Sequence, residues 1–195
     1  MRARMALWVA GVRVELREVS LKAKPHLMLV ASPKGTVPVL VLPGGRVIDE
    51  SLDIMVWARG QADPHGGLHS GADGKALIVA NDGPFKHHLD RAKYPHRYTD
   101  SAAQDHYGAA LALLVQLEAR LSVSSFLCGP HISFADVAIL PFIRQFARLD
   151  AGRFAAEAIP NLRQWLAKWE ASAAFAAIMV KVPLWSEGSD PCRFP

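Results

Sequence analysis

Cysteine is scarce in this sequence, and its two copies are far apart. Cys128 and Cys192 form no C-x-x-C motif and have no metal-ligand spacing. This excludes a disulfide framework and a cysteine-based zinc site, and such sparse use is typical of a reducing compartment. We therefore expect a cytoplasmic protein in which both thiols are inert.

Long apolar runs and blocks of one charge are also absent. A run such as ALALLV, which ends at Val115, is far shorter than the roughly 20 residues that span a bilayer. The formal net charge is +4, from 22 Lys and Arg against 18 Asp and Glu. Because the basic residues are scattered among acidic ones, we expect neither nucleic acid nor a membrane as a partner.

The sequence does have enough apolar residues for a sizeable core, with 51% hydrophobic positions among 195. A polar, glycine-rich stretch, GQADPHGGLHSGADG, separates mixed elements from purely helical ones. We predict a first domain over residues 1–62, a linker over 63–75 and a helical domain over 76–195.

Local patterns predict six elements in the first part. Composition favours helices over residues 2–10, 25–31 and 51–59, the first ending at Gly11. Residues 12–19 alternate apolar and polar, as half-buried strands do. Residues 38–42 and 46–48 fit a hairpin across Gly44-Gly45.

The second part carries three helix signals. Thr99-Asp100 resembles a cap before apolar residues spaced three and four apart from Ala103 to Leu121. Ser133 and Asp136 fit a capping box, so we expect them to be structural and Asp136→Ala to cost about 1 kcal/mol or somewhat more. A third helix places Leu162, Trp165, Leu166 and Trp169 on one face.

Two features on either side of the predicted hairpin suit the recognition of an amino-acid head group. Before it, Pro38 lacks an amide donor, and Val37 can offer an exposed strand edge to an extended peptide. After it, the Glu50 carboxylate can accept from an ammonium group, and Ser51 with the first-turn amides can donate to a carboxylate. The alternative for each is structural: Pro38 starts an edge strand, and Ser51 caps a helix.

The segments KGTVPVL, VIDESLDI and HISFADVAILPF, in this order, resemble the glutathione S-transferase family, nearest its omega-like and bacterial cysteine-type branches. The resemblance implies an α/β thioredoxin-like N-terminal domain, an all-α C-terminal domain and a homodimer. It also implies glutathione as a substrate. Val37 beside a cis-Pro38 would pair with its cysteinyl part, Glu50 and Ser51 would hold its γ-glutamyl head, and Lys24 would reach its glycine carboxylate.

The sequence departs from the family at its beginning. Related chains open with a strand and a Cys-Pro or Ser-Pro turn, before a helix equivalent to the one that here starts at Met1. We therefore expect the catalytic residue just upstream of Met1. The missing strand is central in this fold, so we expect unpaired backbone groups on its neighbours. An earlier start and a rearranged sheet both remain open.

Aromatic and basic residues between Phe85 and Tyr107 suggest the substrate side. Tyr94, Tyr98 and Tyr107 are candidates for a pocket wall, with core packing as the alternative. We expect no metal site, because adjacent His87 and His88 point in different directions on a helix and no matched third ligand is evident.

Taken with the resemblance, these residues suggest a protein that binds glutathione and a small electrophile or mixed disulfide. A cysteine would support thiol transfer or deglutathionylation, and a serine or tyrosine would support conjugation. The competing interpretation is a non-enzymatic interaction or stress-response protein that retains the fold.

Overall fold

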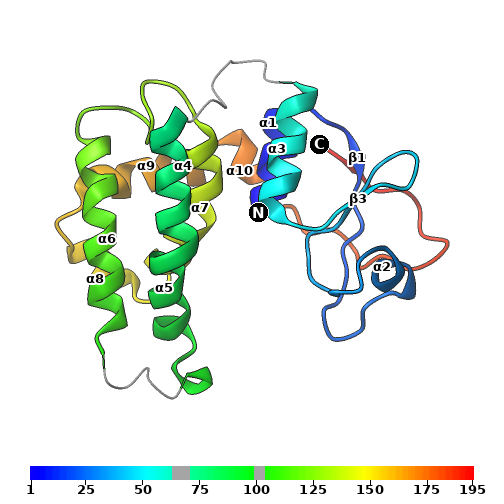
Figure 1. The fold of residues 1–195 in the computed structure, drawn as a ribbon, viewed down its shortest axis with the longest axis horizontal. Helices are drawn as coiled ribbons and strands as arrows, with labels where there is room; N and C mark the ends of the chain where they lie inside the picture. Colours follow the sequence, from blue (N-terminus) through cyan, green and yellow to red (C-terminus); the bar gives the residue numbers. More distant parts are fainter. Residues whose placement is uncertain (63–70, 99–103) are drawn as a thin grey trace. The chain divides into compact units, whose positions relative to one another are not determined.

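The computed structural model describes residues 1–62, 71–98 and 104–195, which fall into two compact units (Figure 1). The first unit comprises residues 1–64 and 172–195, and the second comprises residues 65–171. Our division of the chain into domains stays a prediction. Within the proposed linker, helix α4 begins at Gly71.

The first unit combines helices with short strands. Its elements are α1 (Arg2–Val9), β1 (Val14–Glu15), α2 (His26–Ala31), β2 (Leu40–Val41), β3 (Val47–Ile48), α3 (Ser51–Gln61), α10 (Ala173–Ile178) and β4 (Arg193–Phe194). Helix α1 packs against both α3 and α10. Six elements lie where the local patterns of residues 1–62 predicted them, although the strands are shorter than expected.

The β2–β3 hairpin places α3 and the residues just before it. Leu40 pairs with Ile48 and Val41 with Val47, in antiparallel register. Gly44 and Gly45 make the turn with φ of +88° and +86°, a conformation that favours glycine. One side of the hairpin packs into a core cluster formed by Ala3, Ile48, Ile54, Leu40, Leu42 and Trp57. The start of α3 is thereby anchored by buried apolar contacts.

The stretch that ends the chain runs back along β1. Strand β4 pairs antiparallel with β1, matching Phe194 to Val14. The Leu16 N–H donates to the Cys192 carbonyl at 2.7 Å, and the Trp185 N–H donates to the Glu18 carbonyl at 2.8 Å. We expected unpaired backbone groups on the strands of residues 12–19 and 38–42. For the first of these, residues 184–194 supply backbone partners. The second pairs with β3 on one side.

The regular elements in the described part of the second unit are helices and helical turns. It contains α4 (Gly71–Ala80), the π-helical segment η1 (Asn81–Phe85), α5 (Lys86–Lys93), the 3-10 turn η2 (Pro95–Arg97), α6 (His106–Leu121), α7 (Phe134–Ala147), α8 (Ala151–Ala156) and α9 (Pro160–Glu170). Helix α5 packs against α6, α4 against α7, and α9 against both α6 and α7.

The long helix that the sequence predicts to end at Leu121 is α6. The cap at Thr99-Asp100 and the first apolar position, Ala103, lie outside the described residues. Helix α6 begins at His106, and the Asp105 carboxylate accepts from the Gly108 N–H at 2.9 Å as its cap.

Among the described residues, no helix is both long and apolar enough to cross a membrane.

Candidate functional site

The two residues expected to hold an amino-acid head group lie at the start of α3. Glu50 is the N-cap residue, with extended backbone, and Ser51 is the first helical residue. Neither side chain caps the helix, so the structural alternative for Ser51 does not apply. The Glu50 side chain is 62% exposed. Its carboxylate is thus presented to solvent beside the positive end of a helix.

Glu50 already holds one ammonium group. Lys34 Nζ donates to Glu50 Oε1 at 3.0 Å and to Asp49 Oδ1 at 3.3 Å. Because Lys34 and Glu50 are well exposed, their contact adds little to stability. The contact nevertheless shows that the space around the Glu50 carboxylate admits an ammonium donor.

Asp49 is held in place by a second donor. The Ser32 hydroxyl donates to Asp49 Oδ2 at 2.9 Å, and Ser32 is buried. This hydrogen bond, and then Lys34, keeps the pKa of Asp49 below its ordinary value. The pKa of Lys34 is raised by its bonds to Glu50 and Asp49. Lys34 therefore stays cationic and Asp49 stays anionic at neutral pH.

Lys24 also reaches this turn. A β carbon on Gly35 would lie 3.1 Å from Lys24 Nζ, so this ammonium lies directly against the turn. Gly35 has a φ of +61° and follows Lys34 in the chain. Two lysine ammonium groups thus meet the turn of residues 32–35, one of them in contact with Glu50. This clustering suits a ligand with separated carboxylates and one amine.

Val37 follows two residues after that turn. Its side chain is 50% exposed, and the Val37–Pro38 peptide bond is cis. Its amide and carbonyl form no hydrogen bond with the part of the chain that the structure describes. Such an unpaired backbone is available to an extended peptide.

Sequence reasoning missed Ser32, Lys34 and Asp49. Asp49 lies 17 positions after Ser32 and 15 positions after Lys34, on the other side of the hairpin. Only the folded hairpin brings these residues together. The available signal was the position of Lys34 directly before the Gly35 turn. All the residues of this candidate site belong to the first unit.

The three tyrosines proposed as a pocket wall have different surroundings in the second unit. Tyr107 is only 8% exposed and stacks on Phe146, with 4.5 Å between ring centres. Burial raises the pKa of its hydroxyl. The Arg97 guanidinium lies 4.3 Å from the ring of Tyr94, and that of Arg91 lies 4.4 Å from the ring of Tyr98.

An open depression of about 340 Å³ lies beside Tyr107. Its described lining consists of Arg91, Ala92, Pro95, Gln104, Asp105, His106, Tyr107, Leu149 and Asp150. Tyr94 and Tyr98 are not part of this lining. Their role in substrate binding stays a prediction.

The capping box at the start of α7 is present and extends further than the sequence indicates. The Ser133 N–H donates to Asp136 Oδ2 at 2.9 Å, and the Asp136 N–H donates to the Ser133 hydroxyl at 3.3 Å. Asp136 Oδ1 accepts from the Leu127 N–H at 3.0 Å and from Trp165 Nε1 at 2.8 Å. Burial raises the pKa of Asp136, and these hydrogen bonds oppose the rise. Asp136 thus joins three segments of the second unit.

Neither cysteine lies at the start of a helix. Cys128 is part of a turn in which the Phe126 N–H and the Gly129 carbonyl are bonded, and burial raises the pKa of its thiol. Cys192 precedes β4 and contributes its carbonyl to Leu16. Neither thiol therefore has the position at a helix N-terminus that reactive cysteines often occupy.

Among the His, Cys, Asp and Glu side chains that the structure describes, three histidines lie close enough together to share a metal ion. This group comprises His87, His88 and His106, whose ligand atoms all lie within 4.8 Å of one another. We expected no metal site because His87 and His88 point in different directions on a helix and no matched third ligand was evident. The second premise is wrong, because His106, at the start of α6, belongs to the same group.

The sequence matches models of one family in two places. Residues 1–59 match the N-terminal domain of glutathione S-transferases, and residues 100–168 match the C-terminal domain. A probable glutathione S-transferase, BZ2, of Zea mays is 33% identical over 112 residues. That match covers 56% of this chain and 43% of the maize protein, so the chain spans less than half the length of this curated relative.

Solved structures share the fold. Poplar glutathione transferase F1 matches with a TM-score of 0.75 and 16% identity, over 91% of this chain and 90% of that one. A sphingomonad glutathione S-transferase complexed with glutathione matches with a TM-score of 0.71 and 20% identity, over 90% of both chains. The predicted fold class, a thioredoxin-like N-terminal domain and an all-α C-terminal domain, is therefore confirmed.

Proposed function

Because the chain belongs to the glutathione S-transferase family, we propose that it binds glutathione in its first unit and uses the tripeptide's sulfur in a transfer reaction. The observation that carries this proposal is the exposed Glu50 carboxylate, which accepts an ammonium hydrogen bond at 3.0 Å beside the start of α3. The complex of the sphingomonad protein with glutathione supports the choice of ligand.

The proposed binding mode assigns one part of glutathione to each feature of the site. The α-ammonium of the γ-glutamyl group takes the place of Lys34 Nζ at Glu50. Its α-carboxylate accepts from Ser51 and the first amides of α3. The unpaired backbone of Val37, beside Pro38, bonds the cysteinyl part of the peptide.

The glycine carboxylate goes to a lysine. Lys24 Nζ lies against Gly35. An exposed ammonium supplies a point charge for this carboxylate without requiring a fixed geometry. The site thus offers a carboxylate to the amine of the ligand, the start of α3 to one of its carboxylates and an ammonium group to the other.

Two sulfur reactions are compatible with this mode. In thiol transfer, a thiolate attacks a sulfur of a mixed disulfide and displaces the other thiolate, with no net redox change. In conjugation, the glutathione thiolate forms a carbon–sulfur bond with a small electrophile. The electrophile either loses its leaving group or, when the thiolate adds to a double bond or opens a ring, takes up a proton. We propose one of these for a cytoplasmic homodimer.

Glutathione titrated into the protein by calorimetry tests the proposal. We expect the wild type to bind and Glu50→Ala to bind about tenfold more weakly, because one charge-assisted hydrogen bond is lost. Stability should be unchanged, since the Lys34 pair is exposed. Glu187→Ala, which removes another exposed carboxylate of the first unit, should bind as the wild type does.

A second ligand locates the contact. For the wild type, a glutathione analogue without the α-amino group should bind about tenfold more weakly than glutathione. Glu50→Ala should bind the analogue and glutathione equally, because the substitution and the missing amine remove the same hydrogen bond. Equal affinity of wild type and Glu50→Ala for glutathione would place the head group elsewhere. No binding by the wild type would favour the alternative, a non-enzymatic interaction protein.

A further inference from the structure

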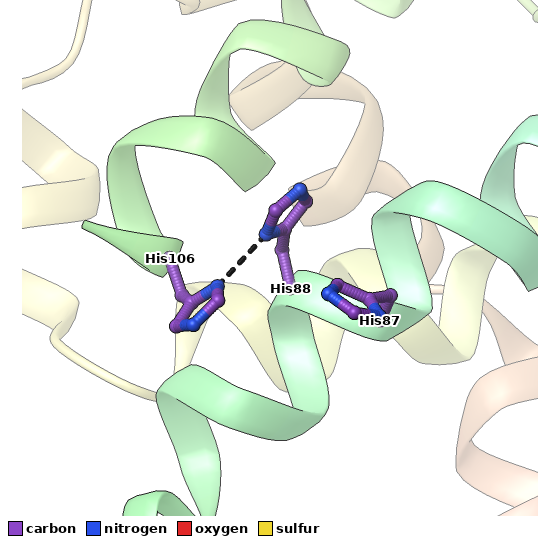
Figure 2. Close-up of side chains that lie close together, drawn as sticks. All are labelled: His87, His88 and His106. Atoms are coloured by element: carbon purple, nitrogen blue, oxygen red, sulfur yellow. Dashed lines mark hydrogen bonds between the residues drawn. The ribbon is translucent and has the colours of Figure 1, made fainter. Parts of the chain in front are cut away.

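We infer that His87, His88 and His106 form a binding site for a divalent transition-metal cation, for which Zn²⁺ is the natural probe. The site lies wholly in the second unit and does not depend on the proposed glutathione function. Two of its ligands come from α5 and the third from the first residue of α6. Figure 2 shows the three rings gathered between these helices.

The contact between His88 and His106 is the strongest geometric evidence. Their Nδ1 atoms face each other at 2.9 Å, as the dashed line in Figure 2 marks. Only one proton fits between them, so one nitrogen must present a lone pair to the other's N–H. A metal ion would use the lone pairs of both. Two nitrogens bound to zinc at about 2.0–2.1 Å in a tetrahedron lie about 3.3–3.4 Å apart, so a shift of a few tenths of an ångström suffices.

His87 completes the group from the solvent side. Its ring centre lies 4.9 Å from that of His88 and 6.1 Å from that of His106. The side chain is exposed, so its ring can turn at little cost. Arg91 Nη1 donates to His87 Nδ1 at 3.0 Å, which requires a neutral imidazole with a lone pair there. When His87 Nδ1 binds metal instead, Arg91 keeps its contact with the Tyr98 ring.

His106 is the buried member of the group. His106 is 4% exposed, and its Nε2 has no hydrogen-bond partner among the described residues. Packing rather than a second hydrogen bond therefore fixes its ring toward His88.

The donor set indicates the class of metal. Three imidazole nitrogens suit Zn²⁺, Cu²⁺ or Ni²⁺ and do not suit Mg²⁺ or Ca²⁺, which prefer oxygen. Three protein ligands leave at least one coordination position for water. A metal bound here would tie α5 to α6.

Zinc binding to tag-free protein at pH 7.5, measured by calorimetry, tests the inference. We expect one Zn²⁺ per chain and a rise in melting temperature with zinc, because the ion binds only the folded state. His88→Gln should weaken binding tenfold or more, as expected when a ligand is lost. His131→Gln removes an exposed histidine outside the group and should leave affinity unchanged.

Two further measurements keep the test decisive. His87 is exposed, so His87→Gln should fold normally and bind zinc more weakly. This variant therefore tests the inference even if His88→Gln does not fold in metal-free buffer with EDTA. In ¹H–¹³C spectra, zinc should shift the ring signals of the three histidines and leave those of His131 in place. The inference is wrong if the wild type binds no zinc up to about 0.1 mM, or if Cys128→Ser/Cys192→Ser abolishes binding while His88→Gln does not.

Discussion

Replacing Asp136 by alanine should lower the free energy of unfolding by about 3 kcal/mol, more than the loss of a helix cap alone costs. The carboxylate accepts hydrogen bonds from Ser133, Leu127 and Trp165, and it is fully buried. Its removal leaves the Leu127 N–H and the Trp165 indole N–H without this acceptor, in a site that water does not reach. Each stranded donor adds to the cost of the lost cap.

Urea unfolding followed by tryptophan fluorescence, together with thermal melting, measures this effect. For a chain of this length the expected fall in melting temperature is about 6–12 °C. Asp150→Ala is the matched control, because Asp150 caps α8 through a single exposed bond to the Arg153 N–H at 2.9 Å. It should cost about 1 kcal/mol. Equal losses in the two variants would mean that the bonds to Leu127 and Trp165 contribute nothing.

Replacing Phe194 by alanine should also cost about 3 kcal/mol, the usual loss when a buried phenylalanine is truncated. Phe194 is 7% exposed and pairs with Val14 in β1. Its buried ring accompanies the backbone pairing of β4. We therefore expect the variant to melt at lower temperature, and the amide of Leu16, which donates to the Cys192 carbonyl, to exchange its hydrogen faster.

Leu184→Ala provides the control within the same stretch of chain. Leu184 lies opposite Glu18 in a β-bridge, but its side chain is 61% exposed. Its truncation keeps the backbone pairing and should change stability by less than about 0.5 kcal/mol. If Phe194→Ala were as stable as Leu184→Ala, the ring would not be part of the core of the first unit.

The head-group site and the histidine group were accessible to sequence reasoning to different degrees. Glu50 and Ser51 are adjacent, follow a Gly-Gly hairpin and open a helix, so their position relative to the helix end could be predicted. Lys34 could not be assigned to Glu50, because their contact depends on how the hairpin folds back. His87 and His88 were noticed as neighbours, but their partner is 18 residues away from His88.

The sequence by itself determined the features that depend on neighbouring residues. It placed α1, α2, α3 and the β2–β3 turn, as well as the capping box of Ser133 and Asp136, because caps, turns and amphipathic faces arise from side chains within about one helical turn of one another. The family motifs belong to the same local level.

Only the tertiary structure decided which distant segments meet. The bond from Trp165 to Asp136, the pairing of β4 with β1 and the approach of His106 to α5 each join residues far apart in the chain. Such contacts depend on how apolar faces pack, and many arrangements of the same helices satisfy a single local pattern. The packing of α6 on α5 selected one arrangement, and that packing turned three separate histidines into a candidate metal site.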